Sequence, residues 1–204
     1  MCGHMPVGED EVIRVNMALA NERNYTAEYI EALPEDVRAE VLDGQLFFMA
    51  APTRTHQKLM MFLAGTFWNY IREHKGVCEV YTAPLGVYLD DDTLLEPDVV
   101  VICDPEKLDE KGCHGAPDFV AEIISPSTRS RDYLLKLNKY QKSGVREYWI
   151  LDVNMNVVHV YNFEQEKMYS YRFTDQVPVH IFDDLQINFS EFASSAAARI
   201  VKNT

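Results

Sequence analysis

Apolar and polar residues along this chain follow two periods, an alternating one typical of strands and a three-to-four-residue one typical of helices. The clearest local signal is a hairpin. Two apolar runs, 37–42 and 45–50, flank the dipeptide Asp43-Gly44, which favours a tight turn between antiparallel strands. The pattern therefore predicts a two-stranded hairpin in the first quarter of the chain.

Two helices are predicted within the first 75 residues. Residues 25–33 carry apolar side chains at helical spacing, with Thr26 as a capping residue, and Pro34 ends the segment. Residues 56–74 repeat the helical spacing over a longer stretch. This second helix is long enough to line one face of a sheet.

The rest of the chain adds strands and one more helix. The predicted strands are two segments within 77–89, then 95–102, 118–124, 146–152, 157–161 and 168–173. A helix from Ser125 to about Ser143, stopped by Gly144, interrupts them. The order predicts an α/β fold of the mixed α+β type, with a central mixed β-sheet flanked by helices. We interpret 1–24 as an N-terminal arm and 25–204 as a single domain.

Composition narrows the class of protein. The chain has 204 residues, of which 47% are hydrophobic and 25% charged, the balance of a folded soluble protein. No apolar run has the length of a membrane span, and charged residues occupy the place of a signal-peptide core, so we expect a cytoplasmic protein without a membrane partner. The formal net charge of -13 argues against broad adhesion to nucleic acid, although it leaves room for a nuclease with a local cation.

The four cysteines are widely spaced, and none forms a Cys-x-x-Cys pair. We therefore expect neither a disulfide scaffold nor a structural zinc site. Cys113-His114 lies among glycines and charged residues, a pattern typical of an ordinary loop.

Two acidic residues stand inside apolar strand-like runs, Asp98 within 95–102 and Glu122 within 118–124. A buried carboxylate costs free energy unless a positive group meets it. If the two strands are neighbours, the carboxylates can bind Mg²⁺ or Mn²⁺, which prefer oxygen ligands and retain water. Such an ion activates a bound water as a nucleophile and stabilises charge on a phosphoryl oxygen.

Two further residues have alternative interpretations. Glu40 also lies in an apolar run and could supply a third carboxylate, but its spacing alone favours a solvent-facing strand residue. His56 stands at the start of the second helix, where a histidine more often has a local structural role than a catalytic one.

Six short motifs in order resemble the Uma-type restriction endonuclease family of the PD-(D/E)XK nuclease superfamily, and the resemblance covers about 25–161. The motifs are Glu40-Val41-Leu42-Asp43-Gly44-Gln45-Leu46, Pro52 to His56-Gln57, Pro97-Asp98-Val99-Val100, Glu122-Ile123-Ile124-Ser125-Pro126-Ser127-Thr128, the set Asp132, Lys136 and Tyr140, and Gly144-Val145-Arg146-Glu147-Tyr148-Trp149 with Asp152. The resemblance implies a restriction-endonuclease-like core. It also implies that Asp98 and Glu122 are metal ligands, and it adds Glu40 to the site.

The chain departs from the superfamily pattern at one position. A lysine is expected two residues after the second acid, and Ile124 stands there. Lys136 on the following helix could replace it. Alternatively, Asp132 and Lys136 form only an i,i+4 ion pair on a helix surface, worth about 0.3–0.5 kcal/mol. Lys139 is a weaker candidate, because it is rotated away from the helix face of Lys136.

These observations lead to two functional hypotheses. The first is a Mg²⁺-dependent (or Mn²⁺-dependent) endonuclease that hydrolyses phosphodiester bonds in DNA, with Glu40, Asp98, Glu122 and Lys136 as its catalytic residues. The second is a nuclease-fold binding or interaction module with weak or no activity, which the acidic composition and the absent strand lysine motivate. By analogy with restriction enzymes, the pair of strands near the C-terminus could support a homodimer.

Overall fold

The computed structural model describes residues 24–34, 37–124, 131–190 and 192. The chain divides into two compact units, one formed by Met1–Ala50 with Asp90–Leu94 and the other by Ala51–Leu89 with Leu95–Thr204. The N-terminal arm predicted for 1–24 lies almost entirely outside the described residues, and the single domain predicted for 25–204 stays a prediction.

The smaller unit is built around the predicted hairpin. Its elements are α2 (Ala27–Glu31), β1 (Ala39–Leu42), β2 (Gln45–Phe48) and the start of β5 (Thr93–Leu95). Strand β1 pairs antiparallel with β2 and, through Val41 opposite Leu94, with β5. The turn residues Asp43 and Gly44 have φ values of 48° and 74°. Positive φ at both positions is what a two-residue hairpin turn requires, so the hairpin prediction is confirmed.

Helix α2 is shorter than predicted. Thr26 occupies the N-cap position, but its side chain makes no capping hydrogen bond. Its backbone carbonyl accepts from the N–H groups of Tyr29 and Ile30 instead. The predicted side-chain cap is therefore wrong, although the helix starts where the sequence indicates.

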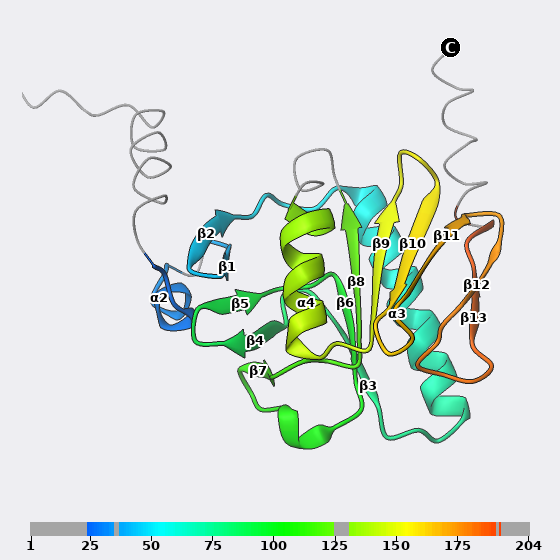
Figure 1. Ribbon diagram of the computed structural model, residues 1–204, viewed down its shortest axis with the longest axis horizontal. Coiled ribbons are helices and arrows are strands. Elements are labelled where there is room, and N and C mark those ends of the chain that lie inside the picture. The colour runs from blue at the N-terminus through cyan, green and yellow to red at the C-terminus, as the bar shows by residue number, and fades with distance from the viewer. Residues whose placement is uncertain (1–23, 35–36, 125–130, 191, 193–204) are drawn as a thin grey trace, which may run out of the picture. The chain divides into compact units, whose positions relative to one another are not determined.

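The larger unit contains a six-stranded mixed sheet in the order β11-β10-β9-β8-β6-β3. In chain order these strands are β3 (Glu79–Thr82), β6 (Val99–Ile102), β8 (Phe119–Ile124), β9 (Glu147–Asp152), β10 (Val157–Asn162) and β11 (Lys167–Arg172). Only β8 and β9 pair in parallel within this sheet; its other described pairs are antiparallel. Figure 1 shows α3 behind this sheet and α4 in front of it. The predicted mixed sheet flanked by helices is confirmed.

Helix α3 (Arg54–Glu73) supplies the core on one face of the sheet. Its buried side chains recur at helical spacing and are Leu59, Leu63, Phe67 and Ile71. The ring centroid of Phe67 lies 4.7 Å from the ring centroid of Phe119 on β8. At the start of the helix, Oγ1 of Thr53 accepts a hydrogen bond from the backbone N–H of His56. This N-cap fixes where α3 begins, two residues earlier than the apolar pattern predicts.

On the opposite face, the described part of the helix starts at Arg131. From Arg131 to Lys136 the backbone is π-helical, and α4 follows over Leu137–Ser143. Gly144 ends it in the left-handed conformation with φ 94°, as predicted. Ser125, Ser127 and Thr128, part of the fourth family motif, fall outside the described residues.

The segment predicted as a loop between β6 and β8 contains a short strand. Strand β7 (Gly112–His114) pairs in parallel with β4 (Gly86–Asp90), after a 3₁₀ turn at Pro105–Lys107. A side-chain carbon at Gly112 would lie 2.1 Å from the carbonyl oxygen of Gly86, so only glycine permits this approach. The loop interpretation of Cys113-His114 is therefore wrong. The pairing depends on a distant glycine contact that local composition does not reveal.

A C-terminal hairpin completes the core. Strands β12 (Gln176–Pro178) and β13 (Gln186–Asn188) pair antiparallel. Side chains of this hairpin and its surroundings join the hydrophobic core, among them Val177, Ile187 and Phe189. None of the helices in the described part of the chain has the length and apolar character to cross a membrane.

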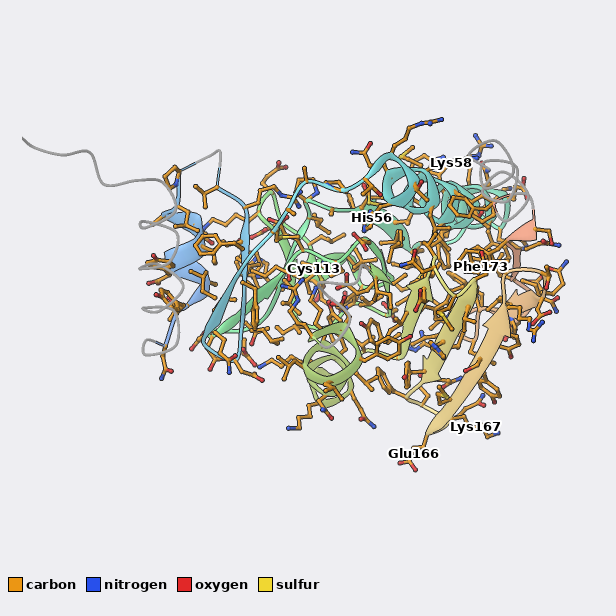
Figure 2. The ribbon with its side chains drawn as sticks, turned by 90° about the horizontal axis from the view of Figure 1, so that it is seen from above. His56, Lys58, Cys113, Glu166, Lys167 and Phe173 are labelled. Carbon is orange, nitrogen blue, oxygen red and sulfur yellow. A yellow bond between two sulfur atoms is a disulfide. The ribbon has the colours of Figure 1, made fainter. Side chains whose placement is uncertain are left out.

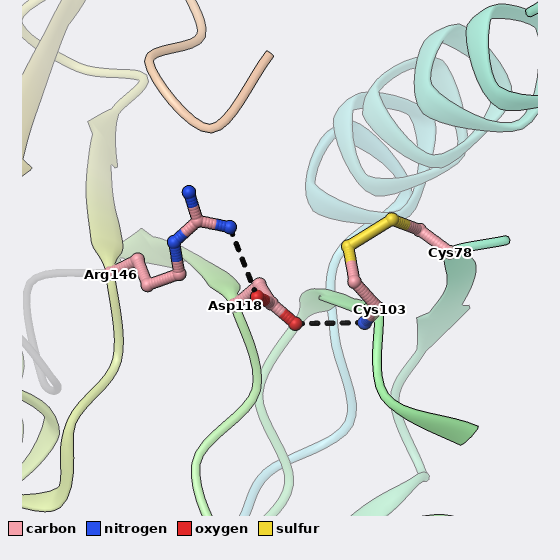
Figure 3. Close-up of a disulfide and its surroundings, with 4 residues drawn as sticks. All are labelled: Cys78, Cys103, Asp118 and Arg146. Carbon is pink, nitrogen blue, oxygen red and sulfur yellow. Dashed lines mark hydrogen bonds and ion pairs between the residues drawn. A yellow bond between two sulfur atoms is a disulfide. The ribbon is translucent and has the colours of Figure 1, made fainter. Parts of the chain in front are cut away.

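A disulfide joins Cys78 to Cys103 (Figure 3), a bond that the sequence, from which we expected no disulfide scaffold, did not predict. Glu79 pairs with Ile102 across β3 and β6, so the residue before one strand lies opposite the residue after the other. This proximity arises from strand register and cannot be inferred from a spacing of 25 residues. The backbone N–H of Cys103 donates to Asp118, whose other oxygen accepts from Arg146. Cys113 is a buried free thiol.

Candidate active site

Asp98 precedes β6 rather than lying within it. Its Oδ2 atom accepts two hydrogen bonds, from the backbone N–H of Ile123 at 2.6 Å and from Nε2 of His56 at 3.0 Å. Both bonds converge on one oxygen. Among the described residues, Oδ1 of Asp98 has no hydrogen bond or ion pair. The carboxylate is thus held by one atom and keeps the other for a ligand.

Strand register brings Asp98 and Glu122 together. In the antiparallel pair β6 and β8, Val99 lies opposite Ala121. Asp98 directly precedes Val99, and its Oδ2 atom accepts from the backbone N–H of Ile123, the residue that follows Glu122. The alternation of β8 sends Ala121 and Ile123 into the core beneath α3, so Glu122 faces α4.

Glu122 is buried, with 6% of its surface exposed. Its Oε1 atom accepts from Nζ of Lys136 at 2.7 Å and from the hydroxyl of Tyr140 at 3.1 Å. Lys136 is itself only 2% exposed. A buried carboxylate needs both a counter-charge and hydrogen-bond donors, and this one has both.

The helix that follows β8 provides these donors through its own periodicity. Asp132, Lys136 and Tyr140 are four residues apart, so they share one face of a helix, and all three are buried. Lys136 also lies 4.0 Å from Oδ1 of Asp132. The interpretation as only a surface i,i+4 pair is wrong, because both residues are buried and Lys136 also contacts Glu122. A catalytic role for Lys136 stays a prediction. Lys139 is also largely buried on α4.

His56 contacts the site, contrary to the purely structural role that the sequence favoured. Its ring lies between α3 and the sheet, which Figure 2 shows from above. Burial lowers the pKa of His56, but the hydrogen bond and negative charge of Asp98 outweigh it, so the pKa lies above 6.5. Nδ1 is buried and has no hydrogen-bond partner among the described residues. The match to a family motif was the only sequence signal for this contact.

Glu40 belongs to the smaller unit, where it lies on β1 opposite Phe47. It is 0% exposed, so the solvent-facing interpretation based on spacing is wrong. Burial on both sides of a short strand hides the alternation on which that interpretation relied. A role for Glu40 as a metal ligand stays a prediction.

The oxygen ligands near Glu122 are of the type that a hard divalent cation prefers, but they are few. Within the described ranges, no three His, Cys, Asp or Glu side chains form a group that could hold a metal ion. The available protein donors are the carboxylates of Asp98, directly before β6, and of Glu122 on the neighbouring strand β8. Mg²⁺ is commonly bound by one or two carboxylates, with water and substrate phosphate completing its shell. Two carboxylates match the number of protein ligands that such an ion commonly takes, and their role as metal ligands stays a prediction.

The mixed sheet between helices defines the fold class of this protein. A crystal structure described as "a putative nuclease belonging to DUF820" from Anabaena variabilis has the same fold, with a TM-score of 0.69 and 19% identity over 83% of this chain and 98% of that one. Residues 26–190 match the Uma2 family, described as "Putative restriction endonuclease", and the chain belongs to this family.

A relative from Synechocystis sp. strain PCC 6803, "Uncharacterized protein slr1290", is 27% identical over 113 residues. The match covers 55% of this chain and 58% of that relative, so it spans less than two thirds of the relative's length.

Proposed function

We propose that this protein is a Mg²⁺-dependent endonuclease that hydrolyses phosphodiester bonds in DNA, and that Mn²⁺ can replace Mg²⁺. One observation carries the proposal, the 2.7 Å contact between Nζ of Lys136 and Oε1 of Glu122. The superfamily pattern needs a lysine beside the second acid, and Ile124 occupies its usual position. Lys136 supplies that ammonium group from the following helix.

Each residue of the site then has a specific task. Asp98 and Glu122 are the proposed metal ligands, and Glu40 remains our candidate for a third on the basis of the family resemblance. When bound, the cation lowers the pKa of a coordinated water and offsets negative charge on the phosphoryl oxygens. Ile123 and His56 hold Oδ2 of Asp98, so that Oδ1 keeps a constant orientation. Lys136 adds a fixed positive charge beside the phosphate, in a setting where little water screens it.

The test is cleavage of plasmid and oligonucleotide DNA by the purified protein with millimolar Mg²⁺ or Mn²⁺. We expect chelation to abolish cleavage, and Asp98→Ala and Glu122→Ala to reduce it by several orders of magnitude. Lys142→Ala is the matched control, because Lys142 is an exposed lysine on the same helix as Tyr140. Cleavage that survives both acid substitutions would reject the proposal.

The contact between Lys136 and Glu122 also supports a second function, that of a binding module with a nuclease fold. The ammonium group of Lys136 already neutralises Glu122, and the whole chain carries a net charge of -13. Calorimetric titration with Mn²⁺ separates the two functions. Absence of heat at millimolar Mn²⁺, together with absence of cleavage, would favour the binding module.

A further inference from the structure

The sheet face that carries Glu122 extends across four strands to a polar pair near the edge. Ile150 lies opposite Glu122, His159 opposite Ile150, and Ser170 opposite His159. Residues directly opposite one another share a face. With strands about 4.8 Å apart, the backbones at His159 and Glu122 are roughly 10 Å apart.

The part of this face on β10 and β11 is not covered by any helix in the described part of the chain. Figure 1 shows α4 in front of β6 and β8, whereas no described helix lies in front of β10 and β11. His159 is half-buried and Ser170 is exposed. His159 and Ser170 are therefore at least partly accessible, within a few nucleotide lengths of the proposed site.

Three side chains form a defined cluster here, which we call the outer platform: Tyr133, His159 and Ser170. The ring centroids of Tyr133 and His159 are 5.5 Å apart, and the two rings are arranged edge to face. Nδ1 of His159 lies 2.8 Å from Oγ of Ser170, and this hydrogen bond fixes the imidazole plane. Tyr133 directly follows Asp132, whose Oδ1 lies 4.0 Å from Nζ of Lys136. The outer platform is therefore next to the proposed site in the sequence as well as on the sheet.

The charge on this face differs from that of the chain as a whole. Arg172 is exposed and lies on the same face, in the row that runs from Ile124 through Asp152 and Val157. Asp152 is 2% exposed, and its carboxylate caps the turn that follows β9. Asp175 accepts a hydrogen bond from the backbone N–H of Arg172. A chain with a net charge of -13 thus presents a positive side chain beside an aromatic pair.

We propose that the outer platform binds an unpaired base next to the scissile phosphate, that Arg172 contacts a neighbouring phosphate, and that the substrate is therefore single-stranded nucleic acid. This inference rests on the proposed nuclease function. Aromatic side chains stack on any base, because every base has a π-face, and in a duplex those faces are already stacked. The net charge of -13 also disfavours a duplex, whose backbone carries a dense negative charge.

The test is fluorescence anisotropy with a labelled single-stranded oligonucleotide and the corresponding duplex, without divalent cations so that no cleavage occurs. We expect the single strand to bind more tightly. Tyr133→Ala and His159→Ala should each weaken its binding on the order of ten-fold, whereas Tyr133→Phe retains the ring and the affinity. Arg172→Ala should lower the magnitude of the slope of log affinity against log salt by about 0.7.

Lys167→Ala is the matched control, because Lys167 is an exposed basic residue of the same strand whose side chain alternates to the other face. Figure 2 shows Lys167 at the end of the β10–β11 hairpin. We expect its removal to leave affinity unchanged. Equal loss in Lys167→Ala and Arg172→Ala would reduce the effect to general charge and overturn the inference.

Cleavage by the wild type and by Asp98→Ala, measured in parallel, separates this inference from the proposed function. Cleavage that depends on Asp98, combined with unchanged binding by Tyr133→Ala and His159→Ala, would overturn the outer platform and retain the nuclease. Tighter binding of the duplex, or no binding of the single strand, would also overturn it. Absence of Asp98-dependent cleavage would instead reject the nuclease.

Discussion

Nζ of Lys136 lies 2.7 Å from Oε1 of Glu122, although 14 residues and a change from strand to helix separate them. Both groups are almost completely buried. Removing one member of such a pair leaves the other charge in the interior without a partner, whereas removing both does not. The contact can therefore be tested through the free energy of unfolding, without an assay of catalysis.

The first prediction concerns this pair. We expect Lys136→Met and Glu122→Gln each to lower the free energy of unfolding by about 3–5 kcal/mol, and the double variant to lose clearly less than the sum of the two. Urea denaturation measures the three values. Lys142→Met, at an exposed position nearby, should change the value by no more than about 0.5 kcal/mol. Strict additivity would contradict a direct interaction.

The second prediction concerns the hydrogen bond from His56 to Asp98. His56→Ala removes one of the two donors that hold Oδ2, so we expect the affinity for Mn²⁺ to fall about 10- to 100-fold. Calorimetric titration measures it. Because the side-chain amide of glutamine can donate a hydrogen bond, His56→Gln should recover part of the loss.

His74→Ala provides the matched control, since His74 caps the other end of α3 and contacts Asp184 rather than Asp98. Its affinity for Mn²⁺ should equal that of the wild type. If His56→Ala also bound Mn²⁺ like the wild type, the contact with Asp98 would have no role in metal binding.

The third prediction concerns Glu147, which is 0% exposed at the start of β9. Burial raises its pKa from 4.5 to about 7, although Nε1 of Trp149 and the backbone N–H of Ile181 donate to the carboxylate. Because the folded state favours the protonated form, this group's contribution to stability is complete below pH 4.5. It is lost as the pH rises to about 7, a change of about 3 kcal/mol.

Glu147→Gln cannot titrate, so it isolates this contribution. The free energy of unfolding, measured with urea at intervals between pH 4.5 and 7.5, should fall less steeply with pH in the variant than in the wild type. Parallel pH profiles for the two proteins would show that Glu147 is not the titrating group.

The fourth prediction concerns the disulfide between Cys78 and Cys103. It closes a loop of about 25 residues, and by the chain-entropy relation its reduction should lower the free energy of unfolding by about 3 kcal/mol. Thermal melts with and without a phosphine reductant measure the effect. In Cys78→Ser/Cys103→Ser the reductant should have no effect; a shift of the melting temperature in that variant would point to another cause.

The local elements of this fold were predictable because each depends on residues close together in the chain. The turn at Asp43-Gly44 depends on two adjacent residues, and the end of α4 depends on Gly144. The apolar stripe of α3 similarly follows from helical spacing. Predictions failed where the outcome depended on a distant partner, as at Gly112 against Gly86 and at Cys78 opposite Cys103.

The candidate site likewise has features that the sequence predicted and features that depend on distant contacts. By itself the sequence determined that Asp98 and Glu122 flank or occupy apolar strands, and the family motifs drew attention to Glu40 and Lys136. Only the tertiary structure decided that Lys136 meets Glu122 and that His56 meets Asp98. Those contacts depend on how β6 and β8 align and on how two helices pack against their faces. The pairing of β6 with β8 and the packing of the two helices join residues that are far apart in the chain, so the pattern within any one segment could not predict these contacts.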